Sequence, residues 1–192
     1  MSESKSSQNN LIIFTGPSGV GKGTIVKQLF SEIKNIKFSI SCTTREMRPG
    51  EKDGVNYFFK SRDEFEAMIA AGDFLEYAEF VGNLYGTPRS FVVDTLDSGN
   101  DVFLEIEVQG AIQVMKKCPE ALTIFLIPPS LEELERRLRK RGTEPEEVLQ
   151  KRLEKAKEEM KFTGQFKFTV VNDDVDIAVR KLKALILGAR NL

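Results

Sequence analysis

A glycine-rich loop between an apolar run and an amphipathic segment constrains the fold of this chain more than any other feature. Residues 11–15 are apolar apart from the final threonine, as in a strand that is buried on both faces. Residues 23–35 carry apolar side chains at helical spacing. The loop between them contains Gly16, Pro17, Ser18, Gly19, Val20, Gly21, Lys22, Gly23 and Thr24. A strand, a glycine loop and a helix in this order indicate a phosphate-binding loop.

This loop has the chemistry that a bound triphosphate needs. Glycines let successive backbone N–H groups approach an anion, and the start of the next helix adds positive potential. Lys22 stands where its ammonium reaches the β- and γ-phosphates. The common motif has a hydroxyl residue directly after the lysine to meet Mg²⁺, whereas Gly23 stands there and Thr24 follows. We therefore expect any Mg²⁺ to be held mainly by phosphates and water.

The bulk composition excludes several classes of function. A length of 192 residues suffices for one domain with a sizeable core. The net charge of −1 argues against a nucleic-acid binder or a membrane-surface binder that depends on bulk electrostatics. The sequence contains no histidine, which excludes histidine acid–base chemistry and histidine metal ligands.

The cysteine content and the apolar pattern favour a cytoplasmic protein. Cys42 and Cys118 are far apart in the sequence, and we expect two free thiols in a reducing compartment. No apolar run approaches the roughly 20 residues of a membrane span. Residues 1–10 are polar and lack the apolar region of a signal peptide, so we expect a disordered tail there.

Strands and helices alternate along most of the chain. We expect strands over 11–15, 38–41, 101–107, 122–127 and 168–171. We expect helices over 23–35, 88–98, 108–117, 130–141, 146–161 and 175–188. This alternation predicts a parallel sheet with right-handed crossovers, and ligands should bind beyond the carboxyl ends of its strands.

Residues 41–87 differ from the segments on either side, because they are largely β-like and aromatic. A capping-box pattern at residues 61–64 opens a short helix. Two strands are expected at 74–81 and 84–87 around a hairpin turn. The pattern predicts a small β-rich lobe that is inserted into the α/β core.

The chain also carries longer motifs in unbroken order. The most specific one reads Ser41-x-Thr43-Thr44-Arg45-x-x-Arg48-x-Gly50-Glu51-x-x-Gly54-x-x-Tyr57. The others are Glu76 with Gly82-Asn83-x-Tyr85-Gly86-Thr87, Glu105-Ile106-Glu107-x-Gln109-Gly110, Arg137-x-x-x-Arg141-Gly142-Thr143-Glu144 and Asn172-Asp173. Together with the glycine loop, these motifs resemble those of the guanylate kinase family from about residue 11 to the C-terminus.

The resemblance implies an activity. Members of the family use Mg²⁺ and transfer the γ-phosphoryl group of ATP to GMP, or to dGMP, which gives ADP and GDP in purine nucleotide metabolism and GMP recycling. The implied partners are the small molecules ATP and GMP, with no nucleic acid and no membrane. The resemblance leaves open whether the chain forms a homodimer.

The resemblance also implies an architecture of the α/β class. It consists of a three-layer P-loop core with a parallel sheet, an inserted small β-rich GMP-binding lobe and a helical lid. On this sequence the core would cover 11–40, 88–129 and 162–192, the lobe 41–87 and the lid 130–161. All of these parts would form one domain over 11–192.

By the same resemblance, the GMP-binding residues are Ser41, Arg45, Arg48, Tyr57, Glu76, Tyr85, Gly86, Thr87 and Glu107. Guanidinium groups pair with phosphate bidentately, and phenol groups add directed donors. Guanine offers donors at N1 and N2, which a carboxylate accepts, and an acceptor at O6, which a hydroxyl satisfies. Adenine has an acceptor at N1, so a carboxylate that faces it would repel it.

Positive side chains suit the phosphoryl transfer itself, which needs positioning and charge neutralisation. The resemblance assigns this role to Lys22, Arg45, Arg137, Arg141 and Arg152, and closure of the lid would exclude water. It places Asn172 beside the adenine of ATP. The other charges of residues 132–161 are expected to form a solvated face.

Two acidic residues depart from the family pattern, which often has aspartate at both places. Glu105 and Glu107 keep the charge but add a methylene group each. Which of them contacts guanine and which orders the waters of Mg²⁺ stays open, with Glu107 favoured for guanine.

Two other functions are compatible with parts of this pattern. One is a kinase for a different nucleoside monophosphate, which an assay of GMP, dGMP, AMP and UMP would distinguish. The other is a non-catalytic interaction module of the same fold, which the retained Lys22 disfavours. Glu76 alternates with apolar neighbours, so its position alone fits a solvent-facing strand residue equally well.

Overall fold

The computed structural model describes residues 10–80, 82–140 and 145–190. Within these residues, the main sheet has five parallel strands in the order β2-β7-β1-β8-β9. The strands are β1 (Leu11–Thr15), β2 (Ile36–Phe38), β7 (Asp101–Glu105), β8 (Leu122–Ile127) and β9 (Phe168–Val171). β1 lies at the centre and is buried along its whole length, which explains why its sequence is apolar on both faces.

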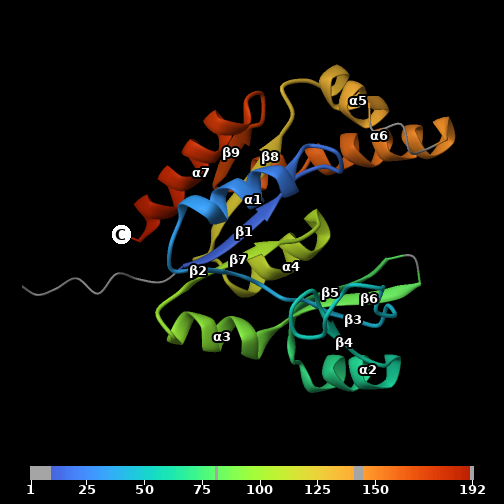
Figure 1. Ribbon diagram of the computed structural model, residues 1–192, viewed down its shortest axis with the longest axis vertical. Helices are drawn as coiled ribbons and strands as arrows, with labels where there is room; N and C mark the ends of the chain where they lie inside the picture. Colours follow the sequence, from blue (N-terminus) through green and yellow to red (C-terminus); the bar gives the residue numbers. More distant parts are fainter. Residues whose placement is uncertain (1–9, 81, 141–144, 191–192) are drawn as a thin grey trace, which may run out of the picture.

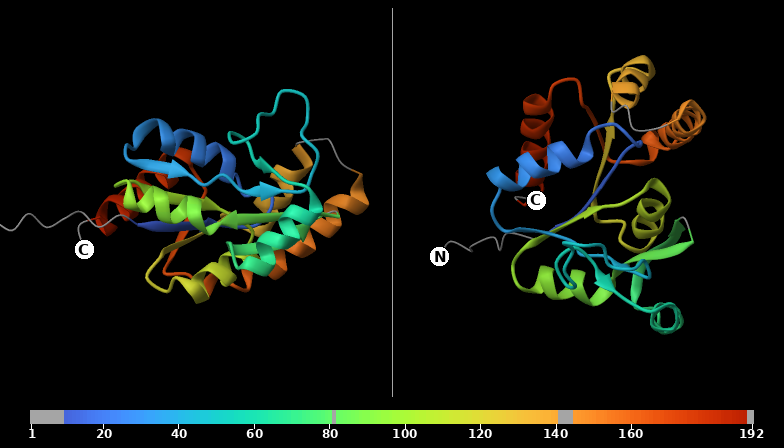
Figure 2. Two further views of the ribbon diagram at one scale, coloured as in Figure 1. Left: turned by 90° about the horizontal axis from the view of Figure 1, so that it is seen from below. Right: turned by 45° about the vertical axis from the view of Figure 1, so that its right-hand side comes forward.

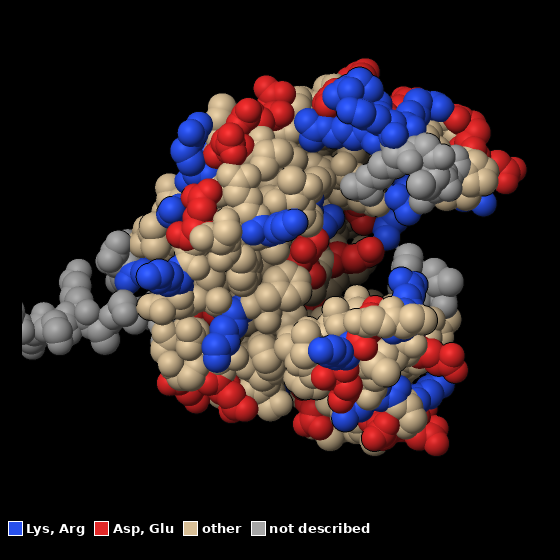
Figure 3. Space-filling view, viewed as in Figure 1, with Lys and Arg blue, Asp and Glu red and all other residues tan. Residues whose placement is uncertain are grey.

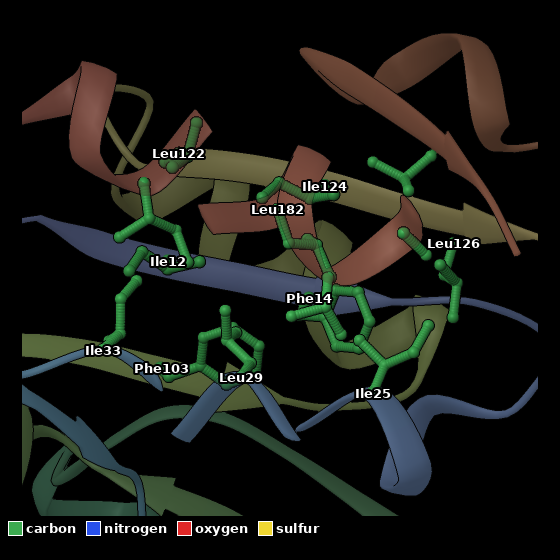
Figure 4. Packing of buried hydrophobic residues seen from close by; sticks show 14 of the residues in the cluster. Ile12, Phe14, Ile25, Leu29, Ile33, Phe103, Leu122, Ile124, Leu126 and Leu182 are labelled. Atoms are coloured by element: carbon green, nitrogen blue, oxygen red, sulfur yellow. The ribbon is translucent and has the colours of Figure 1, made fainter. Parts of the chain in front are cut away.

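Helices cover both faces of this sheet and make three layers (Figures 1 and 2). The helices of the core are α1 (Lys22–Glu32), α3 (Arg89–Asp97), α4 (Val108–Lys117) and α7 (Val175–Ala189). α1 and α7 pack on one face, where Phe14 and Leu29 are fully buried (Figure 4). α3 and α4 pack on the other face, against Ile13 and Leu104. The alternation of β1 side chains between the two clusters thus fixes the central layer.

A second sheet lies beside the core and has the strand order β4-β3-β6-β5 within the described residues. Its strands are β3 (Cys42–Thr43), β4 (Phe58–Phe59), β5 (Phe74–Phe80) and β6 (Asn83–Pro88), and α2 (Arg62–Ala71) packs on it. The expected capping box is present, because Ser61 and Glu64 bond to each other's backbone N–H groups. Phe65 and Phe74 stack at a centroid distance of 4.4 Å in the small core of this unit.

A helical hairpin stands over the carboxyl end of the main sheet (Figure 1). It consists of α5 (Leu131–Lys140) and α6 (Glu146–Met160), and the 3₁₀ turn η1 (Thr163–Gln165) leads from it towards β9. The hairpin has a small core of its own, made of Leu134, Leu138, Leu149, Leu153 and Ala156. Among the described residues, none of the helices combines the length and the apolar character that a membrane span requires.

The structure confirms the expected fold class, with a parallel α/β core and a second small sheet. The strand expected at 38–41 is wrong, because β2 covers Ile36–Phe38 and the chain then changes sheets. The Ser39 N–H still donates to the carbonyl of Phe103 in the core, whereas the Ser41 carbonyl accepts from Phe58 of the second sheet.

Two other element ends differ from the expected ones. The helix expected over 23–35 runs from Lys22 to Glu32, because the backbone turns to an extended conformation at Ile33. The strand expected over 101–107 ends at Glu105, and Glu107 becomes the N-cap of α4. Both ends depend on how the chain leaves the sheet, which local periodicity does not record.

Two isoleucines on α7 test how far the core depends on burial. Ile186 is fully buried in the α1–α7 cluster, whereas Ile177 is 44% exposed on the same helix. Ile186→Ala should lower the free energy of unfolding by about 2–5 kcal/mol, because it removes packed methyl groups and leaves a cavity. Ile177→Ala should change it by less than about 0.5 kcal/mol. Urea denaturation measures both, and equal losses would contradict this account of the core.

Candidate active site

The glycine loop and the start of α1 form an open pocket of about 410 Å³. Gly21 adopts φ +101°, a conformation that favours glycine, and it ends the loop where α1 begins at Lys22. The residues that line the pocket are Ser18, Gly19, Gly21, Lys22, Gly23, Thr24 and Glu105. The first N–H groups of α1 therefore face a concave space, which is the arrangement that binds a phosphate.

Lys22 folds back onto its own loop. Its ammonium donates hydrogen bonds to the backbone carbonyls of Gly16 and of Pro17, the second at 3.2 Å. Burial lowers the pKa of this ammonium below the usual value for lysine, and the nearby carboxylate of Glu105 opposes that shift. Lys22 is thus a partly desolvated cation at the floor of the pocket, where its charge acts strongly on an anion.

The glycine loop packs closely against Leu138 of α5 and against the side chain of Asn172. A Cβ on Gly19 would lie 2.5 Å from the Leu138 side chain, so the loop contacts α5 directly. A Cβ on Gly21 would lie 2.6 Å from the amide nitrogen of Asn172. That amide donates to the Val20 carbonyl at 2.7 Å, and the Asn172 side chain is buried. The amide of Asn172, which the resemblance places beside adenine, therefore faces the loop backbone and supports it.

A second, larger pocket of about 600 Å³ lies between the core, the small sheet and α6. Figure 3 shows this region as a hollow with acidic side chains in its wall. Its lining residues include Ser41, Tyr57, Glu76, Tyr85, Glu105, Glu107, Gly110, Lys155 and Glu159. Glu105 lines both pockets, so the two sites adjoin at the carboxyl end of β7.

Glu76 on β5 is the buried acid of this second pocket. Its side chain is only 6% exposed, which excludes the solvent-facing alternative. The hydroxyl of Thr87, on the neighbouring strand β6, donates to Glu76 Oε1 at 2.6 Å. Burial raises the pKa of the Glu76 carboxyl, while the hydrogen bonds from Thr87 and the charge of Lys117 oppose the shift. Such a carboxylate needs hydrogen-bond donors, and a ligand in the pocket can supply them.

Arg45 lies on an aromatic surface at the edge of the same pocket. Its guanidinium carbon is 5.4 Å from the ring centroid of Tyr57, whose ring lies 6.0 Å from that of Tyr85. A guanidinium N–H donates to Glu51 Oε1 at 2.7 Å, and this bond raises the pKa of Arg45. Glu51 also accepts the backbone N–H of Arg48, whose side chain is exposed. Sequence reasoning placed Glu51 in a motif but missed that it orients Arg45.

Of the three arginines expected to act from the hairpin, the structure describes Arg137 and Arg152. Arg137 donates to Glu133 at 2.7 Å on α5, and its side chain is 23% exposed. Arg152 lies half-buried on α6. Arg141 lies outside the described residues. The structure therefore brings Lys22 to the first pocket and leaves Arg137 paired along its own helix.

The expectation that the remaining charges of residues 132–161 form a solvated face is wrong at Glu159 of α6, and the exposed Lys155 makes a contact that it did not include. Lys155 donates to Glu107 Oε2 at 2.7 Å, across the second pocket from α6 to the N-cap of α4. Glu159 lies half-buried nearby, and its side chain is 12% exposed. Burial raises the pKa of Glu159, and Lys155 opposes that shift. These contacts join segments that are far apart in sequence, so helical charge spacing gave no signal for them.

Two further expected residues have distinct surroundings. Ser41 lines the second pocket. Gly86 is buried inside the small sheet, where a Cβ would lie 2.9 Å from Phe74 and 3.0 Å from the Glu76 carbonyl. Gly86 therefore lets β5 and β6 approach, and its effect on the pocket is indirect.

Because burial raises the pKa of Glu76, we expect this residue to make the free energy of unfolding depend on pH. A carboxyl whose pKa is raised on folding favours the folded state below its unfolded pKa of about 4.3, and this contribution is lost as the pH rises through the folded pKa. Glu76→Gln removes the titration. The variant should therefore gain unfolding free energy relative to the unchanged protein as the pH rises from about 4 to 8. Urea titrations at several pH values measure this difference, and a constant difference would contradict the assigned burial cost.

Known proteins share both the sequence and the shape of this chain. Residues 8–189 match the family model for guanylate kinase. The chain is 56% identical over 176 residues to a guanylate kinase of Lactococcus lactis subsp. lactis (strain IL1403), with 92% of this chain and 86% of that protein covered. It is also 56% identical over 177 residues to a guanylate kinase of Streptococcus thermophilus (strain CNRZ 1066), with 92% and 85% covered.

A solved structure agrees with these sequence matches. The crystal structure of guanylate kinase from Anaplasma phagocytophilum has a TM-score of 0.75 with this chain at 32% identity, and the match covers 96% of this chain and 88% of that one. Both the sequence and the fold of this chain match guanylate kinases over most of their length. The matched part includes the glycine loop, the buried acid of β5, and Arg45 with its tyrosines. This chain belongs to the guanylate kinase family.

Proposed function

We propose that this protein transfers the γ-phosphoryl group of ATP to GMP or dGMP and produces ADP and GDP. The single observation that carries the proposal is the buried carboxylate of Glu76, held by Thr87 in a pocket that adjoins the glycine loop. The two pockets share Glu105, so a nucleoside monophosphate in one can present its phosphate to a triphosphate in the other. The family of the chain supports the same reaction.

The second pocket suits guanine. Glu76 can accept the N1–H and N2–H groups of the base, and the Ser41 hydroxyl can donate to O6. The Thr87 hydroxyl donates its hydrogen bond to Glu76 Oε1 and so orients the carboxylate for the base. An adenine would set its N1 lone pair against this carboxylate and leave buried polar groups unpaired, which should lower kcat/KM for AMP relative to GMP by several orders of magnitude.

The edge of the pocket suits the monophosphate. Arg45 offers a guanidinium fork, and Tyr57 and Tyr85 offer phenol donors beside it. Arg48 is exposed next to this group and supplies a second guanidinium for the dianion. Glu51 holds Arg45 in place beforehand, so less conformational freedom is lost on binding.

The transfer step then needs a concentration of positive charge. The attacking oxygen of GMP is already anionic, so no base has to remove a proton, in agreement with a sequence that lacks histidine. Lys22 would exchange its bonds to the loop carbonyls for bonds to the β- and γ-phosphates. Arg137 and Arg152 of the hairpin, together with Arg141, would add charge, and closure of the hairpin over ATP would exclude water.

The oxygen donors near the glycine loop fit Mg²⁺. Glu105 places a half-buried carboxylate in both pockets, and the hydroxyl of Thr24 lines the first one. The described residues contain no group of three or more side chains of the kind that forms a complete metal cage. A cation that keeps its waters and takes one or two protein oxygens is compatible with this set. When bound, Mg²⁺ would neutralise part of the phosphate charge.

A panel of acceptors tests the proposal directly. With ATP and Mg²⁺, the protein should phosphorylate GMP and dGMP with a kcat/KM at least on the order of 10²-fold above those for AMP and UMP, because only guanine pairs with Glu76. A coupled assay that detects ADP measures this. Faster turnover of AMP than of GMP would refute the proposal, and so would a complete lack of turnover with all four acceptors.

Lys22 provides a second test of the same mechanism. Lys22→Ala should lower kcat with GMP by on the order of 10²-fold or more, because the variant lacks a cation that stabilises the charge of the transition state. Lys27→Ala, on the exposed side of the same helix, should leave kcat unchanged and serves as the control. Steady-state kinetics at saturating ATP and GMP measure both variants. Unchanged turnover in Lys22→Ala would remove this residue from the mechanism.

A further inference from the structure

One face of α4 contacts the backbone of the strand that carries Glu76. Gln113 and Lys117 lie one helical turn apart, and so both point to the same side of α4. Gln113 Nε2 donates to the Tyr77 carbonyl at 3.1 Å, and the Tyr77 N–H donates to Gln113 Oε1 at 3.4 Å. The Lys117 ammonium donates to the carbonyls of Phe74 and Leu75, at 3.2 and 2.6 Å. Side chains of α4 thus hold the residues on both sides of Glu76.

Gly110 continues this face by one turn and meets the Glu76 side chain itself. A Cβ built on Gly110 would lie 2.6 Å from Glu76 Oε2, 3.1 Å from Cδ and 3.5 Å from Cγ. Apart from the neighbours of Gly110 and the backbone of α4, these are the three nearest heavy atoms to that position, and all of them belong to Glu76. Any larger residue would therefore have to displace the carboxylate, which is buried and bonded to Thr87.

The backbone at Gly110 does not explain the glycine. It lies in the first turn of an ordinary helix and is not among the residues with positive φ. Glycine is less favourable than alanine at such a position, because it loses more conformational freedom on folding. The local conformation would therefore accept alanine, and the space needed by Glu76 is what opposes it.

We infer that Gly110 is a positioning residue that sets the selectivity for guanine by leaving room for the Glu76 carboxylate. The inference deepens the proposed function and rests on it. Thr87 fixes one carboxylate oxygen, and the open space over Gly110 admits the other. Gln113 and Lys117 hold the backbone of the strand in place, so filling that space displaces the carboxylate and not the strand. A base that offers two donors would then meet a displaced acceptor.

Gly110→Ala tests this inference. The KM for GMP should rise by on the order of 10-fold or more, while the KM for ATP changes by less than about 2-fold. The ratio of kcat/KM for GMP to that for IMP should fall, because IMP lacks the amino group at position 2 and depends less on the carboxylate. The melting temperature should fall by no more than a few degrees, because the higher helix propensity of alanine offsets part of the cost of displacing the carboxylate.

Gly188→Ala is the matched control. Gly188 lies in α7, and a Cβ there would meet nothing within 4 Å among the described residues. This variant should leave both KM values and the GMP-to-IMP ratio unchanged. A second variant pair, Glu76→Asp with and without Gly110→Ala, tests the contact itself. The shorter acid lies farther from the new methyl group. Gly110→Ala should therefore raise the KM for GMP by a smaller factor in the Glu76→Asp protein than in the unchanged protein.

Three outcomes would overturn the inference. The first is an unchanged GMP-to-IMP ratio in Gly110→Ala. The second is an equal rise of the KM values for ATP and GMP, which a purely structural role predicts. The third is full independence of the substitutions at Gly110 and Glu76. Calorimetry of the unchanged protein with GMP distinguishes these outcomes from failure of the proposed function. If the unchanged protein gives no heat with GMP, the proposed function fails, and the inference fails with it.

Discussion

The parallel pairing of β1 with β7 determines where chemistry can occur in this protein. Their register places Phe14 beside Glu105, so the glycine loop leaves β1 at the level where β7 ends in an acid. Carboxyl ends of parallel strands share one edge of the sheet, and crossover helices keep that edge open. Lys22 and Glu105 come together for this reason, and each shifts the pKa of the other against its own cost of burial.

Negative charge is concentrated in the second pocket, although one proposed ligand is itself a dianion. Burial raises the pKa of Glu76, Glu105 and Glu159, so these carboxylates are held in an unfavourable environment. In the proposed function, Glu76 would bind the base, which offers donors, and the phosphate would lie towards Arg45 at the other edge. The pair between Lys155 and Glu107 offsets part of the remaining charge and connects α6 to α4. A mixed distribution of this kind explains how a chain with a net charge of −1 can recognise two anions locally.

The parts that could be predicted from the sequence are those specified by neighbours along the chain. The glycine loop, the apolar β1 and the capping box at Ser61 are local patterns, and the structure confirms each of them. The burial of Glu76 and the role of Lys155 were not predictable in this way, because both depend on segments that meet only after folding. The end of β2 was missed for the same reason, since Ser39 and Ser41 bond to different sheets. Tertiary contacts override local periodicity at these places.

The side-chain bonds from α4 to β5 also concern how parts of this fold can be exchanged. The second sheet and α2 come between β2 and α3 in the chain and have a small core of their own, so this insertion resembles a module that could be grafted between relatives. The strand that carries Glu76 is nevertheless seated on a core helix through Gln113 and Lys117. A chimaera that replaces the insertion alone would separate the acid from the helix that seats it. The smallest transplantable unit for the proposed recognition of the base therefore combines the insertion with α4.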